Sequence, residues 1–221
     1  MSRMLAVARE SWPIRGVFRI SRGARTEAEV VLVTINEGEL VGRGECVPYA
    51  RYGETVDSVI AQIQGVAAAI ADGIDRESLL SALPSGAARN AVDCALWDLE
   101  AKSKGLPAWR IAGLESAPQP VTTVYTLSVD TPDAMGEAAR LNANRPRLKL
   151  KMTGDGDDLA RVSRIRDNAP GVDLVVDANE AWDLAAYTEI APKLAELGVS
   201  MIEQPLPAGD DGALLGAPRA T

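Results

Sequence analysis

Residues 147–152 read RLKLKM, so Lys149 and Lys151 stand one residue apart among apolar side chains. Side chains alternate between the two faces of a β-strand, so both lysines would share one face. Two ammonium groups that close repel each other, and the crowding is unfavourable unless the protein uses it. One interpretation is a solvated edge strand whose lysines discourage aggregation. The other is a lysine base that its charged neighbour helps to deprotonate. The stretch alone favours the first.

Strands and helices alternate from residue 121 onward. We expect strands at residues 121–129, 147–152, 173–179 and 200–207, with helices at 131–144, 156–170 and 183–198. Such alternation is typical of βαβ units and predicts a parallel sheet. The acidic run GDGDD before the second helix lacks the spacing of a calcium loop and is interpreted as a turn.

The chemistry-bearing residues of this half follow a regular spacing. Asp177 lies 26 residues after Lys151, and Glu203 lies 26 residues after Asp177, each near the end of a predicted strand. In a (β/α) barrel, residues that act in chemistry lie at the C-terminal ends of successive strands. Singly, Asp177 could cap a strand and Glu203 could be solvated. Together with the lysine pair they predict a site for a cation and a base.

Composition narrows the chemistry. The chain of 221 residues contains no histidine, which excludes Ser-His-Asp, Cys-His and HExxH sites. Any metal would be held by oxygen ligands, which favours Mg²⁺. The net charge of −8 argues against nucleic-acid or membrane partners. The N-terminal residues resemble neither a signal peptide nor a membrane span. The two distant cysteines, Cys46 and Cys94, suit the cytoplasm, and Cys94 is expected in a helical core.

The pattern of residues 1–117 predicts an α+β domain. A hairpin is expected at residues 36–38, between two β-branched runs. Helices follow, one over residues 55–73 with Thr55 as N-cap and one that ends at Gly105. We therefore expect two domains, residues 1–117 and 118–221, joined at the segment ESAPQP.

Several segments resemble a known family. RLKLKM, LVVDANEAW and MIEQPLP are similar to barrel motifs of the enolase superfamily, in its muconate-lactonizing-enzyme-like subgroup. ARNAVDCALWDLEAKSKGLP resembles the end of that family's capping domain. SRGARTEAEVV and GRGECVPYARYGET are most similar to loops of dipeptide epimerases, which interconvert L,L and L,D dipeptides such as Ala-Glu. The resemblance implies an α/β chain: an α+β capping domain, then an incomplete (β/α) barrel of about four βα units.

The resemblance also implies catalytic and metal-binding roles. Lys151 would remove or return the α-proton of the substrate, and Lys149 would favour the neutral form of Lys151 and stabilise the enolate. Asp177 and Glu203 would be ligands of Mg²⁺, which holds the substrate carboxylate as negative charge develops.

The same resemblance implies a dipeptide as the small-molecule substrate. Arg22 is a candidate for binding its distal carboxylate, although a solvated arginine beside Arg25 is an equal alternative. Tyr52 is a candidate wall of the substrate site. Thr126 and Asn179 are further candidates for substrate binding, and Asn179 shares a strand face with Asp177.

Four predicted strands are half of a complete barrel. The family pattern has a third acidic ligand on strand five and an opposing lysine on strand six. We therefore expect a truncated or interrupted dipeptide epimerase, inactive or impaired as this chain, with an assembled half-barrel as the alternative.

Other functions stay open at this stage. One alternative is a related enzyme: a muconate cycloisomerase, an o-succinylbenzoate synthase or an N-acylamino acid racemase. Another is a non-catalytic, self-associating fragment. A homo-oligomer is expected because an open barrel interior would expose apolar side chains. The candidates for that interior are Leu148 or Leu150, Val175 or Val176, and Ile202.

Overall fold

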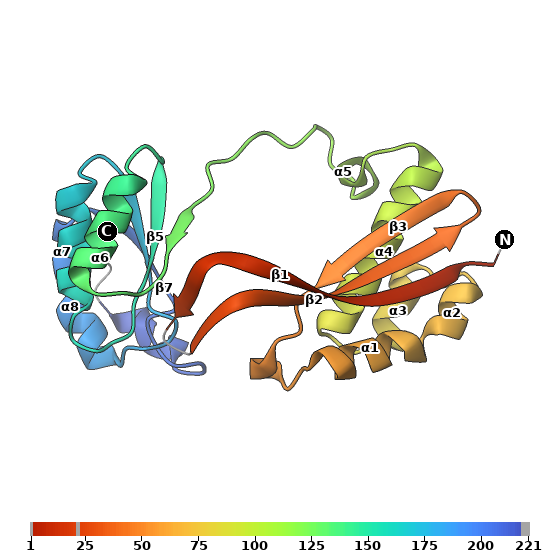
Figure 1. Ribbon diagram of the computed structural model, residues 1–221, viewed down its shortest axis with the longest axis horizontal. Helices are drawn as coiled ribbons and strands as arrows, with labels where there is room; N and C mark the ends of the chain where they lie inside the picture. The colour runs from red at the N-terminus through yellow and green to blue at the C-terminus, as the bar shows by residue number, and fades with distance from the viewer. Residues whose placement is uncertain (1, 21–22, 218–221) are drawn as a thin grey trace. The chain divides into compact units, whose positions relative to one another are not determined.

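The computed structural model describes residues 2–20 and 23–217 and divides the chain into two compact units. The first unit comprises Met1–Ile14 and Glu27–Gln119, and the second comprises Arg15–Thr26 and Pro120–Thr221. Neither unit is therefore one continuous segment of chain. Figure 1 shows both units and labels most of their helices and strands.

The first unit contains an antiparallel sheet with the strand order β1-β2-β3. Its strands are β1 (Met4–Ile20), β2 (Gly23–Glu37) and β3 (Leu40–Cys46). The predicted hairpin is confirmed, since Glu37 pairs with Leu40 and Gly38 takes a φ of 61° that glycine adopts readily. The length of β1 was not predicted, because Pro13 and charged residues interrupt its apolar alternation.

Six helical segments follow β3 in the described part of the first unit. They are η1 (Ala50–Tyr52), α1 (Val56–Gly65), α2 (Ala67–Ala71), α3 (Arg76–Ala82), α4 (Ala87–Lys104) and α5 (Ala108–Ile111). The single helix predicted over residues 55–73 is wrong, because Val66 leaves helical geometry and separates α1 from α2. The N-cap is confirmed, since Thr55 Oγ1 accepts a hydrogen bond from the Ser58 N–H at 3.1 Å. Gly105 ends α4 in the left-handed conformation, as predicted.

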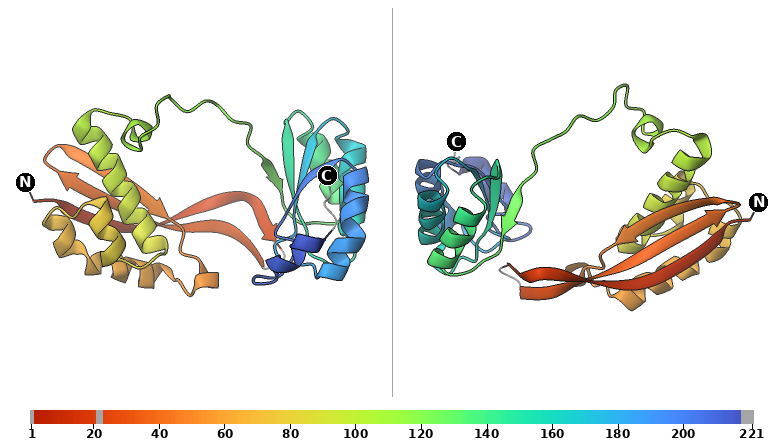
Figure 2. Two further views of the ribbon diagram at one scale, coloured as in Figure 1. Left: turned by 180° about the vertical axis from the view of Figure 1, so that it is seen from behind. Right: turned by 45° about the horizontal axis from the view of Figure 1, so that its top comes forward.

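Helix α4 covers one face of this sheet (Figure 2). The two backbones touch: a Cβ added to Gly44 would lie 2.0 Å from the Ala91 carbonyl oxygen. The buried stripe of α4 includes Ala91, Val92, Ala95 and Leu99, as expected. Cys94 lies outside that stripe and is exposed, so its predicted place in the core is wrong.

The second unit contains a parallel sheet with the order β4-β5-β6-β7. The strands are β4 (Tyr125–Leu127), β5 (Arg147–Lys151), β6 (Asp173–Asp177) and β7 (Val199–Glu203). The helices are α6 (Pro132–Leu141), α7 (Asp158–Asn168) and α8 (Leu184–Glu196), followed by η2 (Asp211–Gly216). This arrangement confirms the predicted fold class, an α+β capping part followed by an incomplete (β/α) barrel. Within the described ranges, no helix has the length and hydropathy needed to cross a membrane.

The tip of the β1–β2 hairpin, Arg15–Thr26, belongs to the second unit. The Val129 N–H donates to the Arg19 carbonyl oxygen at 3.3 Å, and the Arg19 N–H donates to Ser128 Oγ at 3.3 Å. Both partners of Arg19 directly follow β4. The tip is thus hydrogen-bonded to a segment more than a hundred residues later in the chain.

Helices α6, α7 and α8 pack on one face of the parallel sheet. Leu148, Leu150 and Val176 are fully buried on that face, with Ile202 packed against the same cluster. The expectation that these four residues line an open, apolar interior is therefore wrong, whereas Val175 pairs with Lys149 and lies on the opposite face of the sheet. Across the sheet lie the charged side chains described below, with Met201 at 48% exposure. The homo-oligomer stays a prediction.

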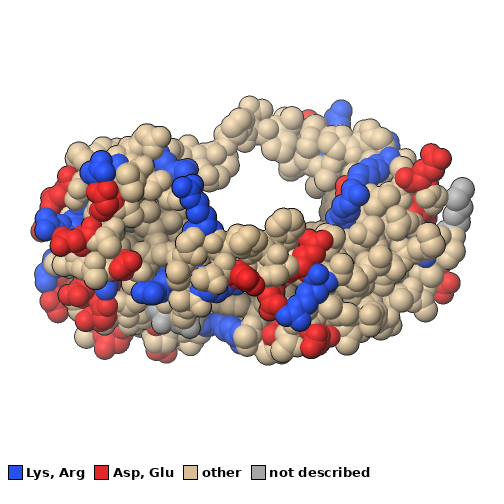
Figure 3. Space-filling model, viewed as in Figure 1, with Lys and Arg blue, Asp and Glu red and all other residues tan. Residues whose placement is uncertain are grey.

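Charged side chains of both signs are interspersed over the visible surface of this unit (Figure 3).

An ion pair between Arg147 and Asp173 joins the first residues of β5 and β6. Asp173 accepts hydrogen bonds from Ser200 Oγ at 2.5 Å and from Arg147 Nε at 2.6 Å. The Ser200 hydroxyl and then the Arg147 guanidinium lower the pKa of Asp173 below its ordinary value. A carboxyl whose pKa is lower in the folded chain stabilises the fold above about pH 4 and loses this effect as the pH falls through the folded pKa.

We therefore expect Asp173→Asn to lower the free energy of unfolding more at pH 7 than at pH 3. Urea unfolding of both proteins at the two pH values measures the difference. An equal loss at pH 7 and pH 3 would contradict the assignment of the stabilising charge to Asp173.

Candidate active site

The last residues of three adjacent strands meet at one edge of the parallel sheet. In the strand register, Lys151 of β5 pairs with Asp177 of β6, and Asp177 pairs with Glu203 of β7. Residues that are 26 positions apart in the sequence are therefore neighbours on adjacent strands. Lys149 pairs with Thr126 of β4, so Thr126 lies on the same sheet face as the lysines.

Three ion pairs join these side chains. Lys151 Nζ lies 2.5 Å from Asp177 Oδ2, and Lys149 Nζ lies 2.9 Å from the same oxygen. Lys149 Nζ also lies 2.5 Å from Glu203 Oε2 and so bridges the two carboxylates. The repulsion between the two ammonium groups is therefore offset by an anion that both contact.

The central carboxylate is buried. Asp177 is 1% exposed and Lys151 is 8% exposed. Burial opposes ionisation of Asp177, but hydrogen bonds from the two lysines outweigh it and lower its pKa. Burial likewise opposes the charge on Lys149, but hydrogen bonds to Glu203 and Asp177 outweigh it and raise its pKa. A buried carboxylate requires such partners, because an unpaired buried charge is strongly destabilising.

The backbone directly after these strands is held in an uncommon conformation. Asn179, Glu180 and Gln204 have φ values of 48°, 67° and 47°. The Asn179 N–H donates to Asp177 Oδ1 at 2.9 Å, and Asn179 Nδ2 donates to Gln204 Oε1 at 3.2 Å. Left-handed non-glycine residues cost about 1–3 kcal/mol each and cluster at functional sites. Gln204 was not predicted, although it follows Glu203 and precedes a proline.

The remaining candidates lie elsewhere or outside the described residues. Tyr52 belongs to the first unit, is 74% exposed and meets Tyr49 edge-to-face at 5.6 Å. It lines a cavity of about 630 Å³ in that unit, together with Glu54 and Asn90. Arg22 lies outside the described residues.

The donor set at the strand ends suits a hard cation. Asp177 and Glu203 supply carboxylate oxygens from adjacent strands, and a positive group, the Lys149 ammonium, already lies between them. Mg²⁺ is commonly held by one or two carboxylates and completes its coordination with water and substrate. Among residues 2–20 and 23–217, no cluster of three or more His, Cys, Asp or Glu side chains is arranged to hold a metal.

Curated relatives share this sequence over most of its length. The L-Ala-D/L-Glu epimerase of Escherichia coli (strain K12) is 44% identical over 215 residues, which are 96% of this chain and 66% of the relative. The N-acetyl-D-glutamate racemase of a Pseudoalteromonas species is 39% identical over 190 residues, 84% of this chain and 59% of the relative. The chain thus spans 59–66% of the length of these relatives.

Solved structures share the fold. An enolase family member from Agrobacterium tumefaciens with homology to dipeptide epimerases, with bound sodium and L-Ala-L-Glu, superposes with a TM-score of 0.94 at 44% identity, over 99% of this chain and 67% of that one. The dipeptide epimerase of Enterococcus faecalis V583, complexed with Mg and L-Leu-L-Tyr, gives 0.86 at 28% identity, over 97% and 64%.

Two family models match the chain. Residues 2–113 match the mandelate racemase / muconate lactonizing enzyme N-terminal domain, and residues 134–218 match the enolase C-terminal domain-like family. These matches confirm the resemblance inferred from the sequence motifs. The chain belongs to the mandelate racemase / muconate lactonizing enzyme family of the enolase superfamily.

Proposed function

We propose that the chain carries the lysine side of a dipeptide epimerase site, in which Lys151 moves the α-proton of the substrate. The observation that carries this proposal is the contact of Lys149 and Lys151 with Asp177 at the ends of adjacent strands. The division into a capping domain, residues 1–117, and a barrel domain, residues 118–221, is part of the proposal. The epimerases among the relatives support it.

In this mechanism, Lys151 in its neutral form takes the proton from Cα of the residue to be inverted. The electron pair of the C–H bond moves toward the neighbouring carboxylate, and an enolate forms. The Lys149 ammonium, which lies beside Asp177 on the same sheet face as Lys151, offsets part of the new negative charge. Return of a proton to Cα completes the exchange, and return to the opposite face inverts the centre.

Mg²⁺ is the proposed cofactor, with Asp177 and Glu203 as its ligands. When bound, it would withdraw electron density from the substrate carboxylate and stabilise the charge that develops there. The dipeptide epimerase of E. faecalis, solved with Mg, supports this choice of metal. Asn179 would keep Asp177 in position through the hydrogen bond from its N–H to Oδ1.

We expect Asp177→Asn and Glu203→Gln each to weaken Mg²⁺ binding by about tenfold or more. Each change removes an anionic oxygen, and loss of an outer hydrogen-bond partner alone costs about 10–100-fold in metal affinity. Calorimetric titration measures the affinities. Asp173→Asn is the matched control, because it neutralises a carboxylate on the same strand. Equal affinities in all three variants would remove the metal from this site.

Two substrate classes are proposed for the same chemistry. The first is L-Ala-L-Glu, after the epimerase of E. coli. The second is an N-acylated glutamate, after the racemase of Pseudoalteromonas. Arg22, Tyr52, Thr126 and Asn179 are the residues proposed to bind the substrate.

Deuterium incorporation from D₂O tests the function. The chain with Mg²⁺ is incubated separately with L-Ala-L-Glu and with N-acetyl-L-glutamate, which have the same configuration at the glutamate Cα, and α-proton loss is followed by NMR. We expect exchange in L-Ala-L-Glu above the level of Lys151→Ala. Exchange in N-acetyl-L-glutamate alone would replace the dipeptide by the acylamino acid. Loss of neither α-proton, in a folded chain that binds Mg²⁺, would overturn the proposed function.

A further inference from the structure

Asp158 and Arg161 are buried charged residues that the proposed mechanism does not use. They are 2% and 5% exposed and lie in the first turn of α7. In the described part of the chain, the other buried charged residues are Lys151 and Asp177 of the candidate site. Burying a charge costs several kcal/mol unless partners satisfy it, so the partners of this pair indicate what it holds in place.

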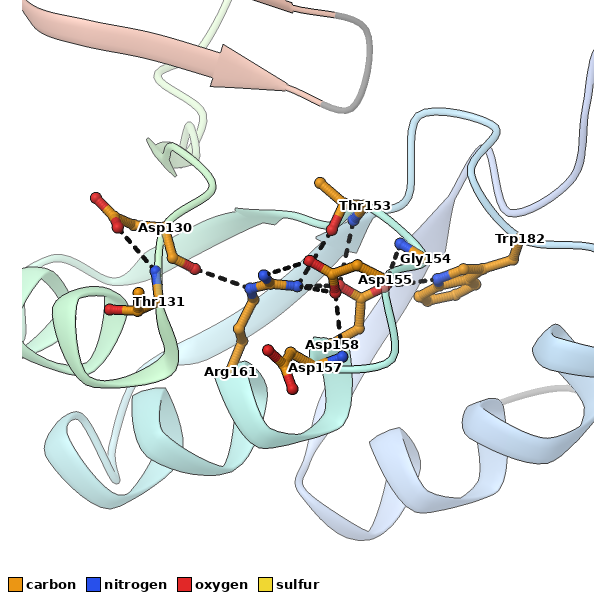
Figure 4. A network of polar contacts seen from close by, with 9 residues as sticks. All are labelled: Asp130, Thr131, Thr153, Gly154, Asp155, Asp157, Asp158, Arg161 and Trp182. Atoms are coloured by element: carbon orange, nitrogen blue, oxygen red, sulfur yellow. Dashed lines mark hydrogen bonds and ion pairs between the residues drawn. The ribbon is translucent and has the colours of Figure 1, made fainter.

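The Asp158 carboxylate binds the loop that follows β5. It accepts hydrogen bonds from the N–H groups of Thr153, at 3.2 Å, and Gly154, at 2.8 Å. These amides lie two and three residues after Lys151. The same carboxylate accepts a hydrogen bond from Trp182 Nε1 at 2.8 Å (Figure 4). Trp182 lies in the segment between β6 and α8, so one side chain joins two loops.

The two loops also touch through their backbones. A Cβ added to Gly154 would lie 2.4 Å from the Ala181 carbonyl oxygen, and Gly154 has a φ of 71°. Trp182 is 3% exposed and belongs to the core cluster of the second unit. The loop after β5 is therefore fixed against the loop after β6.

Arg161 adds the loop after β4 to this network. Its Nε donates to the Asp130 carbonyl oxygen at 2.8 Å, and its Nη1 donates to Asp158 Oδ1 at 2.8 Å. The guanidinium also binds both oxygens of Asp155, at 2.6 and 2.7 Å, and these hydrogen bonds hold the pKa of Asp155 below its ordinary value. Figure 4 shows these contacts converging on one guanidinium from different segments.

We propose that Asp158 and Arg161 are positioning residues. They hold together the loops after β4, β5 and β6 and thereby set the spacing between Lys151 and Asp177. The effect on catalysis rests on the proposed function, but the coupling of the loops does not. Misplacing a reacting group by about 1 Å can lower a rate by about 10²-fold, so the loops would matter without contacting the substrate.

Amide hydrogen exchange, read by mass spectrometry, tests the coupling in Trp182→Phe and Asp158→Asn. Trp182→Phe removes one hydrogen bond and keeps an aromatic ring, so it remains informative if Asp158→Asn does not fold. We expect about tenfold faster exchange in peptides covering residues 152–158 and 178–183. Arg164→Gln is the control, since Arg164 lies on the same helix in an exposed ion pair with Asp133. Exchange equal to that of the control in both loops would overturn the proposal.

The catalytic part is tested by the rate of α-proton exchange in L-Ala-L-Glu. We expect kcat to fall by about 10- to 100-fold in Trp182→Phe, while KM stays within about threefold. A kcat equal to that of Arg164→Gln would overturn the positioning role. If the parent chain exchanges no substrate proton, the proposed function fails, and amide exchange still decides whether Asp158 and Arg161 couple the loops.

Discussion

Lys151→Ala is expected to lower the rate of α-proton exchange in L-Ala-L-Glu by about 10³-fold. A positioned general base contributes about 10²–10⁴-fold, and no other lysine ends a strand of this sheet in the described residues. Lys149 bridges Asp177 and Glu203, which keeps its ammonium charged. It is therefore a poor substitute for the missing base. NMR in D₂O, with substrate in excess, measures the rate.

Lys193→Ala is the matched control for this experiment. Lys193 lies on α8, is about half exposed and forms an ion pair with Glu189. Its loss removes a lysine from an exposed position on α8 and should leave the rate unchanged. Exchange by Lys151→Ala as fast as that of the control would show that Lys151 is not the base.

Gly44→Ala is expected to lower the free energy of unfolding of the first unit by about 3 kcal/mol. The added Cβ would lie 2.0 Å from the Ala91 carbonyl oxygen and 2.7 Å from the Ala95 nitrogen. Both contacts are with backbone, so β3 and α4 would have to separate. Overpacking of a core typically costs about 1–3 kcal/mol, and a clash with helix backbone belongs at the upper end.

Gly65→Ala is the control that isolates this clash. Gly65 is the last residue of α1, and a Cβ added there meets no atom within 4 Å. Alanine is favoured over glycine in helices by up to about 1 kcal/mol, so this variant should be as stable as the parent or more stable. The free energies of unfolding of the two variants are compared by chemical denaturation, with amide exchange of the α4 peptides as the signal for the first unit. Equal stability would mean that β3 and α4 separate at little cost.

The fold could be predicted where local chemistry and tertiary packing agree. Gly105 ends α4 and Thr55 begins α1 as predicted, because each supplies its cap locally. Gly105 adopts the left-handed conformation, and the Thr55 side chain accepts a hydrogen bond from a free backbone N–H of the first turn. Two elements escaped prediction for opposite reasons. β1 continues through Pro13 because sheet pairing overrides a weak local pattern. The strand predicted over residues 121–129 shrinks to Tyr125–Leu127, since β-branched residues alone do not supply a pairing partner.

The candidate site could be predicted because parallel strands convert regular spacing into lateral contact. Lys151, Asp177 and Glu203 are neighbours for this reason. Asp158 and Arg161 could not be found in the same way, because an acidic run before a helix normally marks a solvated turn. Only tertiary structure shows that this carboxylate is covered by Trp182 and neutralised by the guanidinium.

The hairpin tip has a consequence for building chimaeras with relatives. A gene fusion made near residue 119 takes all of the sequence before that point from one parent and all of the sequence after it from the other. The second unit, however, is encoded in two pieces, because Arg15–Thr26 belongs to it. Such a fusion would join the tip of one parent to the Ser128–Val129 segment of the other, where Arg19 forms its hydrogen bonds. Recombination within this family should therefore succeed more often when both pieces are inherited from the same parent.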